Sequence, residues 1–551
     1  MLGLAGSLYA MNVYDRVVPN NATETLWVLT LGVLLVYVFD FLLRTARAYF
    51  VDAAGKGADA AIAARLFEHV MALRLEARPA STGALASNLR DYESLREFFT
   101  SATLIALVDL PFLLLFIAVA WAIAGPVAWV ALIAVPLVLL VGLCVQIPLN
   151  RAIERNQAES AQKHAILIES IEGLETLKVA RAEGRAQRLW ERFVAASARS
   201  AMASRVFSTL AINFTAFATS VAGALVILFG VYEIAAGRLT MGALIAATIL
   251  TGRALAPLGQ IAALIVRVNQ SMVALRALDK LMKAPRERDG AATYVSRPAL
   301  RGQIELHDVS FAYPPMSVGL MAAASPATVS AASLFIGVGE RVGIVGRVGS
   351  GKSTLARLIT GLYQPSQGAV LVDGTDIRQL DPGELRRQIG YVPQDPFLVF
   401  GSIRDNLRIG TPGADDEALL RAATIAGVDD FVKARQQGYD LQVGERGQYL
   451  SGGQRAAVTI ARALITDPPI LLLDEPTGAM DSTSEQRLKS RLEQLLPGRT
   501  LIIITHRGSM LSLVDRLIVM DNGRIVADGP KQAVLQELQA GSIRAGGRVV
   551  S

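Results

Sequence analysis

Cysteine is almost absent from this sequence of 551 residues, and charged and aromatic side chains are scarce. The single cysteine, Cys144, cannot form an intrachain disulfide and has no partner for a cysteine-based metal site. Charged residues make up 19% of the chain, whereas about one quarter is usual in soluble proteins. Hydrophobic residues make up 52%, which is too many for disorder. The composition therefore excludes a disulfide-stabilised miniprotein and a disordered chain, and it leaves an apolar excess to be located.

The apolar residues are concentrated in the first half of the chain. A helix needs about 20 apolar residues to cross a bilayer core of about 30 Å. Five segments meet that need, namely 26–43, 102–124, 127–147, 209–236 and 241–266. Gly125-Pro126 lies between segments 102–124 and 127–147, and Gly237-Arg238 lies between 209–236 and 241–266, as turns within two helical pairs would. The sequence therefore predicts a helical membrane domain that lies in the lipid bilayer.

Residues 1–13 are apolar but too short to cross a membrane. One interpretation is a signal peptide, but the segment lacks a basic start and a small-residue cleavage site. We expect it instead to be the end of a first membrane helix that begins upstream of Met1. The predicted domain then has six helices, of which the first is truncated.

Basic residues set the predicted orientation. Eight Lys and Arg residues lie in 44–100 and ten lie in 148–206, whereas the short connectors carry almost none. Positive loops stay in the cytoplasm, so both basic stretches and the C-terminal half are expected there. Residues 148–206 also have helical periodicity, which predicts membrane helices that continue into the cytoplasm and pair as hairpins.

The net charge of +6 has two interpretations, a nucleic-acid partner or the basic loops of a membrane protein. The second agrees with the location of the basic residues, so we expect no nucleic acid. Three charged residues, Asp40, Asp109 and Arg253, lie in or beside apolar spans. Such residues either line a transport pathway or form buried polar contacts that hold helices together, and the sequence supports both alternatives equally.

The pattern changes after residue 283. Residues 284–302 are polar and contain proline and glycine, which is typical of a linker. From 303 to 551, short β-rich runs such as 342–345, 470–473 and 501–504 alternate with helical segments. The predicted fold is therefore an all-α membrane domain over 1–283, followed by an α/β domain with a largely parallel sheet.

A glycine-rich loop begins the candidate site of the second domain. Gly346 to Ser353 fits the pattern G-x-x-x-x-G-K-[ST], between a β run and a predicted helix. Its backbone N–H groups can point at phosphates, with Lys352 at the β- and γ-phosphates and Ser353 on Mg²⁺. The candidate ATP-binding residues here are Gly346, Gly349, Ser350, Gly351, Lys352, Ser353 and Thr354.

Two further motifs complete the predicted site. Asp474 and Glu475 end an apolar strand, where Asp474 suits Mg²⁺ coordination and Glu475 suits polarisation of an attacking water. Ser451, Gly452, Gly453 and Gln454 start a helical pattern and form a second anion-binding turn. A single nucleotide does not need two γ-phosphate-binding turns from one chain. We therefore expect this second turn to close over ATP that is bound by another copy of the chain.

Residues 303–545 resemble the nucleotide-binding domain of ABC transporters in the order of these motifs. The resemblance implies ATP and Mg²⁺ as cofactors and adds four residues. Tyr313 corresponds to the aromatic that stacks on adenine, and Gln394 to the glutamine that reaches Mg²⁺. His506 corresponds to the switch histidine at the γ-phosphate, and Asp481 to the aspartate that acts across the dimer.

Three positions depart from the family pattern. The segment Gly478-Ala-Met-Asp481 replaces a loop that usually begins with serine and has leucine before aspartate. Ala456 lies where glutamine is common. The interval from Tyr313 to Gly339 is about eight residues longer than usual by this resemblance and rich in Ala and Ser.

The fusion of six spans to one such domain resembles an exporter half-transporter, and a homodimer is the simplest assembly. The segment Asn12 to Trp27 resembles the first external loop of bacterial type I secretion ABC transporters. That resemblance implies export of unfolded polypeptides from the inner membrane, with a periplasmic adaptor and an outer-membrane channel as partners. Export of a lipid or small hydrophobic molecule and a non-transport ABC ATPase are the alternatives.

Overall fold

A computed structural model describes residues 2, 4–78, 102–288, 293–314 and 326–540. The chain forms two compact units. The first comprises Met1–Met71 and Pro79–Ala284, and the second comprises Ala72–Arg78 and Pro285–Ser551. The predicted start of the first membrane helix, part of the first basic stretch, and most of the insert after Tyr313 lie outside the described residues.

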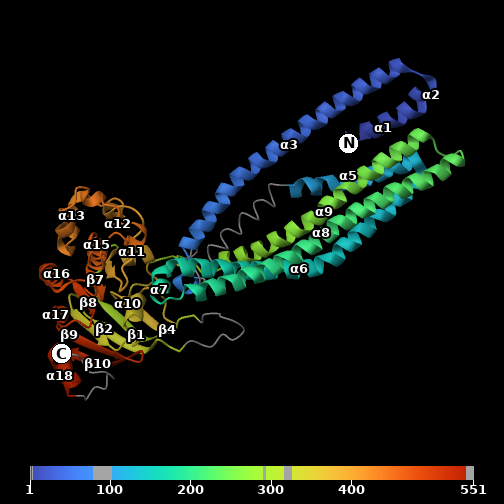
Figure 1. The fold of residues 1–551 in the computed structure, drawn as a ribbon. Helices are drawn as coiled ribbons and strands as arrows, with labels where there is room; N and C mark the ends of the chain where they lie inside the picture. The colour runs from blue at the N-terminus through green and yellow to red at the C-terminus, as the bar shows by residue number, and fades with distance from the viewer. Residues whose placement is uncertain (1, 3, 79–101, 289–292, 315–325, 541–551) are drawn as a thin grey trace. The chain divides into compact units, whose positions relative to one another are not determined.

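The first unit consists of helices (Figure 1). Its elements are α1 (Leu4–Asn12), the π-helix η1 (Val13–Val17), α2 (Val18–Asn20), α3 (Thr23–Met71), α5 (Ala102–Ala124), the 3₁₀ turn η3 (Gly125–Ala128), α6 (Trp129–Glu172), α7 (Leu174–Val179), α8 (Glu183–Ala235) and α9 (Met241–Met282). The predicted turns are confirmed, because helices end and restart at Gly125-Pro126 and around Gly237-Arg238. Helices α6 and α8 also run through 148–206 as the periodicity predicted.

Three described helical stretches are long and apolar enough to cross a membrane, namely Thr23–Phe50, Pro111–Glu172 and Glu183–Ala235. A shorter apolar stretch covers Met241–Ala256. Helix α1 has nine residues, which agrees with the expectation that residues 1–13 are too short to span a bilayer.

Small side chains line the places where these helices pack closely, as is usual in membrane proteins. Ala131 of α6, Ala222 of α8 and Ala254 of α9 are all buried in one apolar cluster. In Figure 1, α6, α8 and α9 lie side by side along much of their length. Large apolar side chains such as Leu34 and Phe229 are exposed instead, which is typical of a surface covered by lipid.

The charged residues of the spans have different surroundings. Arg44 Nε lies 2.8 Å from Asp40 Oδ2, and the two residues are one helical turn apart. Their opposite charges therefore neutralise each other. Arg253 is half-buried on α9. The side chain of Asp109 lies outside the described part of the chain.

The second unit contains two sheets. The six-stranded sheet has the order β10-β9-β3-β8-β7-β6, and only β10 is antiparallel to its neighbour. Its strands are β3 (Arg341–Gly346), β6 (Ile389–Val392), β7 (Ile470–Asp474), β8 (Thr500–Ile504), β9 (Arg516–Asp521) and β10 (Arg524–Pro530). The antiparallel sheet has the order β2-β1-β4-β5, with β1 (Ile304–Phe311), β2 (Val329–Ile336), β4 (Gln367–Val372) and β5 (Thr375–Asp376).

The central strands are buried on both faces, as parallel strands usually are. On β7, Leu471 and Leu473 enter one apolar core while Ile470 and Leu472 enter the other. The helices of this unit are α10 (Lys352–Ile359), α11 (Pro382–Arg387), α12 (Ile403–Arg408), α13 (Asp416–Ala426), α14 (Asp429–Val432), α15 (Gly452–Leu464), α16 (Ser482–Leu495), α17 (Gly508–Leu511) and α18 (Lys531–Gln539). The predicted α/β architecture is therefore confirmed.

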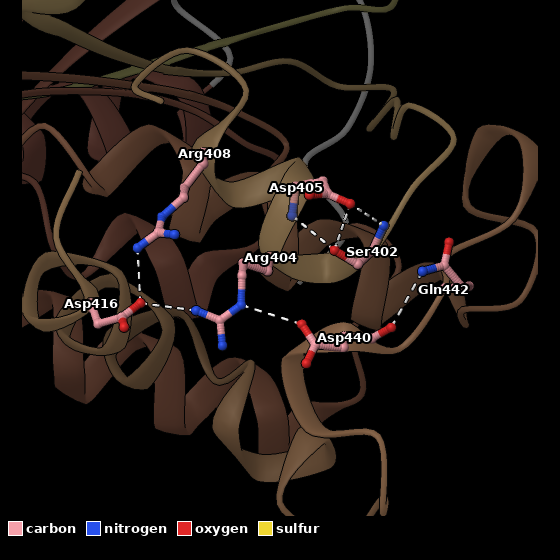
Figure 2. Close-up of polar contacts among 7 residues, drawn as sticks. All are labelled: Ser402, Arg404, Asp405, Arg408, Asp416, Asp440 and Gln442. Atoms are coloured by element: carbon pink, nitrogen blue, oxygen red, sulfur yellow. Dashed lines mark hydrogen bonds and ion pairs between the residues drawn. The ribbon is translucent and has the colours of Figure 1, made fainter. Parts of the chain in front are cut away.

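A polar network joins the short helices between β6 and α15. Figure 2 shows Arg404 of α12 between two carboxylates, those of Asp416 and Asp440. Arg408 donates to the same oxygen of Asp416 at 2.8 Å. The Ser402 hydroxyl and the Asp405 carboxylate cap the start of α12 reciprocally, as Figure 2 also shows. Exposed ion pairs stabilise little individually, so the network chiefly orients α12 against its neighbours.

The segment Ala72–Arg78 lies far from the rest of the second unit in sequence but packs within it. Arg74 N donates to Pro285 O at 3.1 Å. Glu76 Oε1 accepts a hydrogen bond from Gln364 N at 2.5 Å. A short piece of the helical half of the sequence thus belongs structurally to the α/β unit.

Candidate functional site

The glycine-rich loop lies between the end of β3 and the start of α10, as the motif predicts. Gly346 has φ of +155° and Gly351 has φ of +97°. A Cβ on Gly346 would lie 2.1 Å from Met520 O, and one on Gly351 would lie 2.6 Å from Thr328 O. Only glycine fits these two positions, so the backbone can curl back and expose its N–H groups.

Lys352 is the first residue of α10 and is 8% exposed. Its Nζ donates to Gly346 O and Arg347 O, both at 2.7 Å. Burial lowers the pKa of this ammonium, and the carboxylates of Glu475 and Asp474 oppose the shift. The cation is thus held over the loop and faces the two acids that follow β7.

A cavity brings most of the predicted site together. It is lined by Thr328, Val348, Gly349, Ser350, Gly351, Lys352, Ser353, Thr354, Gln394, Asp474, Glu475, Ile504 and His506. Every predicted residue of the phosphate loop except Gly346 lines this cavity, and Gly346 is the last residue of β3. Thr328 is a residue that the sequence reasoning missed. It directly precedes β2 and carries no motif, so only the close approach of its carbonyl to Gly351 identifies it.

Asp474 is 1% exposed at the end of β7. Neither of its carboxylate oxygens has a hydrogen bond of good geometry within the described chain. Burial raises the pKa of Asp474, and the nearby Ser353 hydroxyl only partly opposes this shift. A buried carboxylate without a partner is costly, so the site is suited to a cation between Asp474 and Ser353.

Glu475 has a strained backbone, with φ of +48°. Such non-glycine residues cost about 1–3 kcal/mol and cluster at functional sites. The strain persists because Glu475 N donates to Ile504 O at 2.8 Å, which ties the turn to β8. Its Oε1 lies 3.7 Å from His506 Nε2. Burial raises the pKa of Glu475, and His506 works against that shift.

Tyr313 lies beside the cavity and does not line it within the described residues. Its hydroxyl bonds Thr354 Oγ1 at 3.0 Å and accepts from Arg357 at 3.1 Å. Its ring contacts those of Phe311 and Tyr363 edge-on, with centroids 5.1 and 5.4 Å away. The side chain is therefore anchored on α10, and its contact with adenine stays a prediction.

The second glycine turn forms a separate group. Ser451 caps α15 reciprocally with Gln454, and Gly452 and Gly453 occupy the first turn. Ser451, Gly453 and Gln454 line a cavity together with Asp481, the N-cap of α16. Within the described residues, none of these four lines the cavity around Lys352. One chain thus presents two separate polar sites rather than one.

These features define the chain as a membrane protein with a P-loop ATPase domain. A model of the ABC transporter family matches residues 329–478, and a model of the ABC transporter transmembrane region matches residues 1–256. The chain belongs to the ABC transporter family and has the architecture of an exporter half-transporter, as the sequence predicted. It binds ATP in its soluble domain and hydrolyses it to drive transport.

Two relatives illustrate the similarity. The cyclolysin secretion/processing ATP-binding protein CyaB of Bordetella pertussis is 35% identical over 550 residues, which cover 98% of this chain and 76% of the relative. The leukotoxin export ATP-binding protein LtxB of Aggregatibacter actinomycetemcomitans is 33% identical over 540 residues, covering 98% and 75%.

A solved structure supports the same fold. A bacterial Atm1-family ABC exporter with ATP bound is similar with a TM-score of 0.88 and 26% identity. The similarity covers 100% of this chain and 96% of that chain. The predicted order of a helical membrane domain followed by an ABC ATPase domain is therefore confirmed.

Proposed function

We propose that this chain exports polypeptides across a bacterial inner membrane as the ABC component of a type I secretion system. The observation that carries the proposal is the likeness to CyaB and LtxB, which extends over 98% of the chain and so includes the membrane half. The names of both relatives refer to toxin secretion or export. A lipid or drug exporter is the alternative, and no particular observation favours it.

The proposed ATP site divides the work among residues at the Lys352 cavity. The backbone of the glycine-rich loop and the Lys352 ammonium bind the phosphates. Ser353, Gln394 and Asp474 would hold Mg²⁺ through side-chain oxygens, the kind of ligand that this cation prefers. Bound there, Mg²⁺ would neutralise phosphate charge.

Glu475 and His506 are the proposed catalytic residues. Glu475 is placed by its strained turn to accept a proton from the attacking water, and burial favours this role by raising its pKa. His506, on the neighbouring strand end, is placed to donate to the γ-phosphate. Phosphoryl transfer depends on such positioning more than on covalent chemistry by the protein.

The second polar site is proposed to act in trans. Ser451, Gly452, Gly453, Gln454 and Asp481 would contact ATP held by the Lys352 loop of the partner copy, in a homodimer. The N-terminus of α15 suits this role because the first turn of a helix attracts anions through its backbone N–H groups and its dipole. A periplasmic adaptor and an outer-membrane channel are the proposed further partners.

The function can be tested in the bacterium that carries the gene. We compare the proteins in the culture medium after deletion of the gene and complementation with the wild-type chain or with Glu475→Gln. The proposal predicts that at least one polypeptide disappears from the medium and returns only with the wild-type chain. An unchanged set of secreted proteins, with altered membrane lipids or drug efflux, would instead support the alternative.

A further inference from the structure

Arg507 directly follows His506 and lies where β8 leads into α17. Its guanidinium bonds the carboxylate of Glu485 on α16. It also donates to two backbone carbonyls, Gly478 O at 3.1 Å and Met480 O at 3.4 Å. One side chain therefore joins the switch-histidine segment to α16 and to the loop before it, which we name the 478–481 loop.

Glu485 completes this connection from the other side. It is 5% exposed, and its carboxylate accepts hydrogen bonds from Arg507 and from the Ser509 hydroxyl. A buried carboxylate is stable only when it is paired and hydrogen-bonded. Both partners come from the segment that begins at His506, so this carboxylate fixes that segment against the first turn of α16.

The 478–481 loop in turn contacts the start of α15. A Cβ on Gly452 would lie 2.9 Å from Ala479 Cβ, and one on Gly453 would lie 3.2 Å from Ala479 O. The loop ends at Asp481, whose side chain caps α16. The loop that Arg507 holds by its carbonyls is thus packed against the turn that carries Ser451.

We infer that the Arg507–Glu485 pair is a positioning element that makes His506 and the 478–481 loop move as one body. Under the proposed function, His506 serves the ATP of its own chain, whereas Asp481 and the Ser451 turn serve the ATP of the partner copy. The pair therefore couples the two ATP sites of the dimer. The inference rests on the proposed roles of these residues and adds a connection between them.

The mechanism follows from the bonding pattern. Arginine offers donors in a rigid fork, so Arg507 can hold a carboxylate and two carbonyls at once. Lysine retains the charge but has a single donor centre, and it cannot reproduce the contact with Gly478 and Met480 together. In Arg507→Lys the carboxylate stays paired, while the link between His506 and the loop is loosened.

The test uses the purified full-length chain reconstituted in lipid, with ATPase rates measured across ATP concentrations. Arg507→Lys is expected to lower kcat about tenfold, to change KM less than about twofold, and to reduce the cooperativity of ATP hydrolysis. The matched control is Arg499→Lys, since Arg499 also bonds one carboxylate and two carbonyls but lies away from His506. It is expected to leave all three quantities unchanged.

Thermal unfolding of the same samples separates positioning from stability. The inference requires that Arg507→Lys and Arg499→Lys shift the unfolding temperature alike while only the former lowers kcat and cooperativity. A normal kcat and cooperativity in Arg507→Lys, or an equal loss in both variants, would overturn it. If Arg507→Lys does not fold, Glu485→Gln is judged by the same criteria, because its amide preserves volume and removes the ion pair.

A double variant gives an independent check. Arg507→Lys with Glu485→Gln is expected to lose no more activity than the worse single variant, because both act through one connection. Additive losses would contradict the inference. If the Glu475→Gln variant hydrolysed ATP at the wild-type rate, the proposed catalytic role of Glu475 would be refuted. That result is distinct from one in which only the Arg507 variants behave differently from the expectation.

Discussion

His506 Nε2 lies 3.7 Å from Glu475 Oε1, and the two residues come from the ends of the adjacent parallel strands β8 and β7. The carboxyl ends of parallel strands meet at one edge of the sheet, where ligand sites form in open α/β folds. The proposed base, Glu475, and the proposed donor to the γ-phosphate, His506, therefore both line the cavity at the Lys352 loop. The proposed chemistry depends on this juxtaposition.

The first prediction concerns Glu475. Replacement by glutamine preserves its volume and removes the base, so kcat should fall by about a thousandfold while ATP binding is retained. ATPase assays and ATP titration of the reconstituted chain measure the two quantities. Glu417→Gln, at an exposed position on α13, should leave both unchanged. A normal kcat in Glu475→Gln would exclude Glu475 as the base.

The second prediction concerns the unpaired carboxylate of Asp474. Asp474→Asn should raise the Mg²⁺ concentration needed for half-maximal ATPase activity by about tenfold or more, because a charged ligand is lost. The same change should raise the unfolding temperature in the absence of Mg²⁺, because it removes a buried charge whose oxygens accept no hydrogen bond of good geometry. An unchanged Mg²⁺ requirement would exclude Asp474 as a ligand.

The third prediction concerns the loop glycines. Gly351→Ala should abolish ATP binding, because its Cβ would lie 2.6 Å from Thr328 O at a φ of +97°. Gly374→Ala is the control, since Gly374 also has a positive φ of +74° but has no atom within 4 Å of an added Cβ. It should cost only about 1 kcal/mol of folding free energy and leave ATP binding intact. Equal binding by both variants would show that the loop tolerates a side chain at 351.

The fourth prediction is a pH dependence of stability at Asp429, which is 6% exposed at the start of α14. Burial raises its pKa, but hydrogen bonds from Thr424 and Tyr439 and the Lys433 ammonium outweigh this effect, so the folded pKa lies below the ordinary value. A depressed carboxyl pKa stabilises the fold above the unfolded pKa of about 3.9. That stabilisation is lost as pH falls through the folded pKa.

Asp429→Asn should accordingly unfold at lower urea concentration than the wild-type chain at pH 7. The difference should begin to shrink as the pH is lowered below about 4, where the carboxylate of the unfolded chain takes up a proton, and should be smallest below the folded pKa. Urea unfolding at several pH values measures both curves. A difference that stays constant with pH would mean that the hydrogen bonds stabilise the neutral group equally well.

Local patterns were sufficient to predict much of this molecule. The Gly346–Ser353 loop, the acids after β7 and the Ser451 turn each follow from a few consecutive residues, because their chemistry depends on a strand or helix end. The alternation that buries β7 on both faces is also local. These features were predicted because the physical cause lies within about ten residues.

Other features depend on contacts between distant segments. Glu76 bonds Gln364 N across 288 positions of sequence, so no local pattern indicated that Ala72–Arg78 belongs to the α/β unit. The approach of Thr328 to the phosphate loop and the bonding of Arg507 to Glu485 likewise depend on tertiary packing. The hydroxyl of Tyr313 bonds α10, an orientation that the motif alone does not specify.

The most direct test of the proposed two-copy ATP site measures ATP hydrolysis in dimers purified by two different tags, one on each copy. One copy carries Lys352→Ala and the other Ser451→Arg, or both changes lie on one copy paired with a wild-type copy. The first arrangement leaves one site with Lys352 and Ser451 both intact, so activity clearly above background is expected, at most about half of the wild-type rate because only one of the two sites is complete. The second damages both sites, and activity near background is expected. Equal activity in the two arrangements, or more in the second, would contradict a site shared between copies.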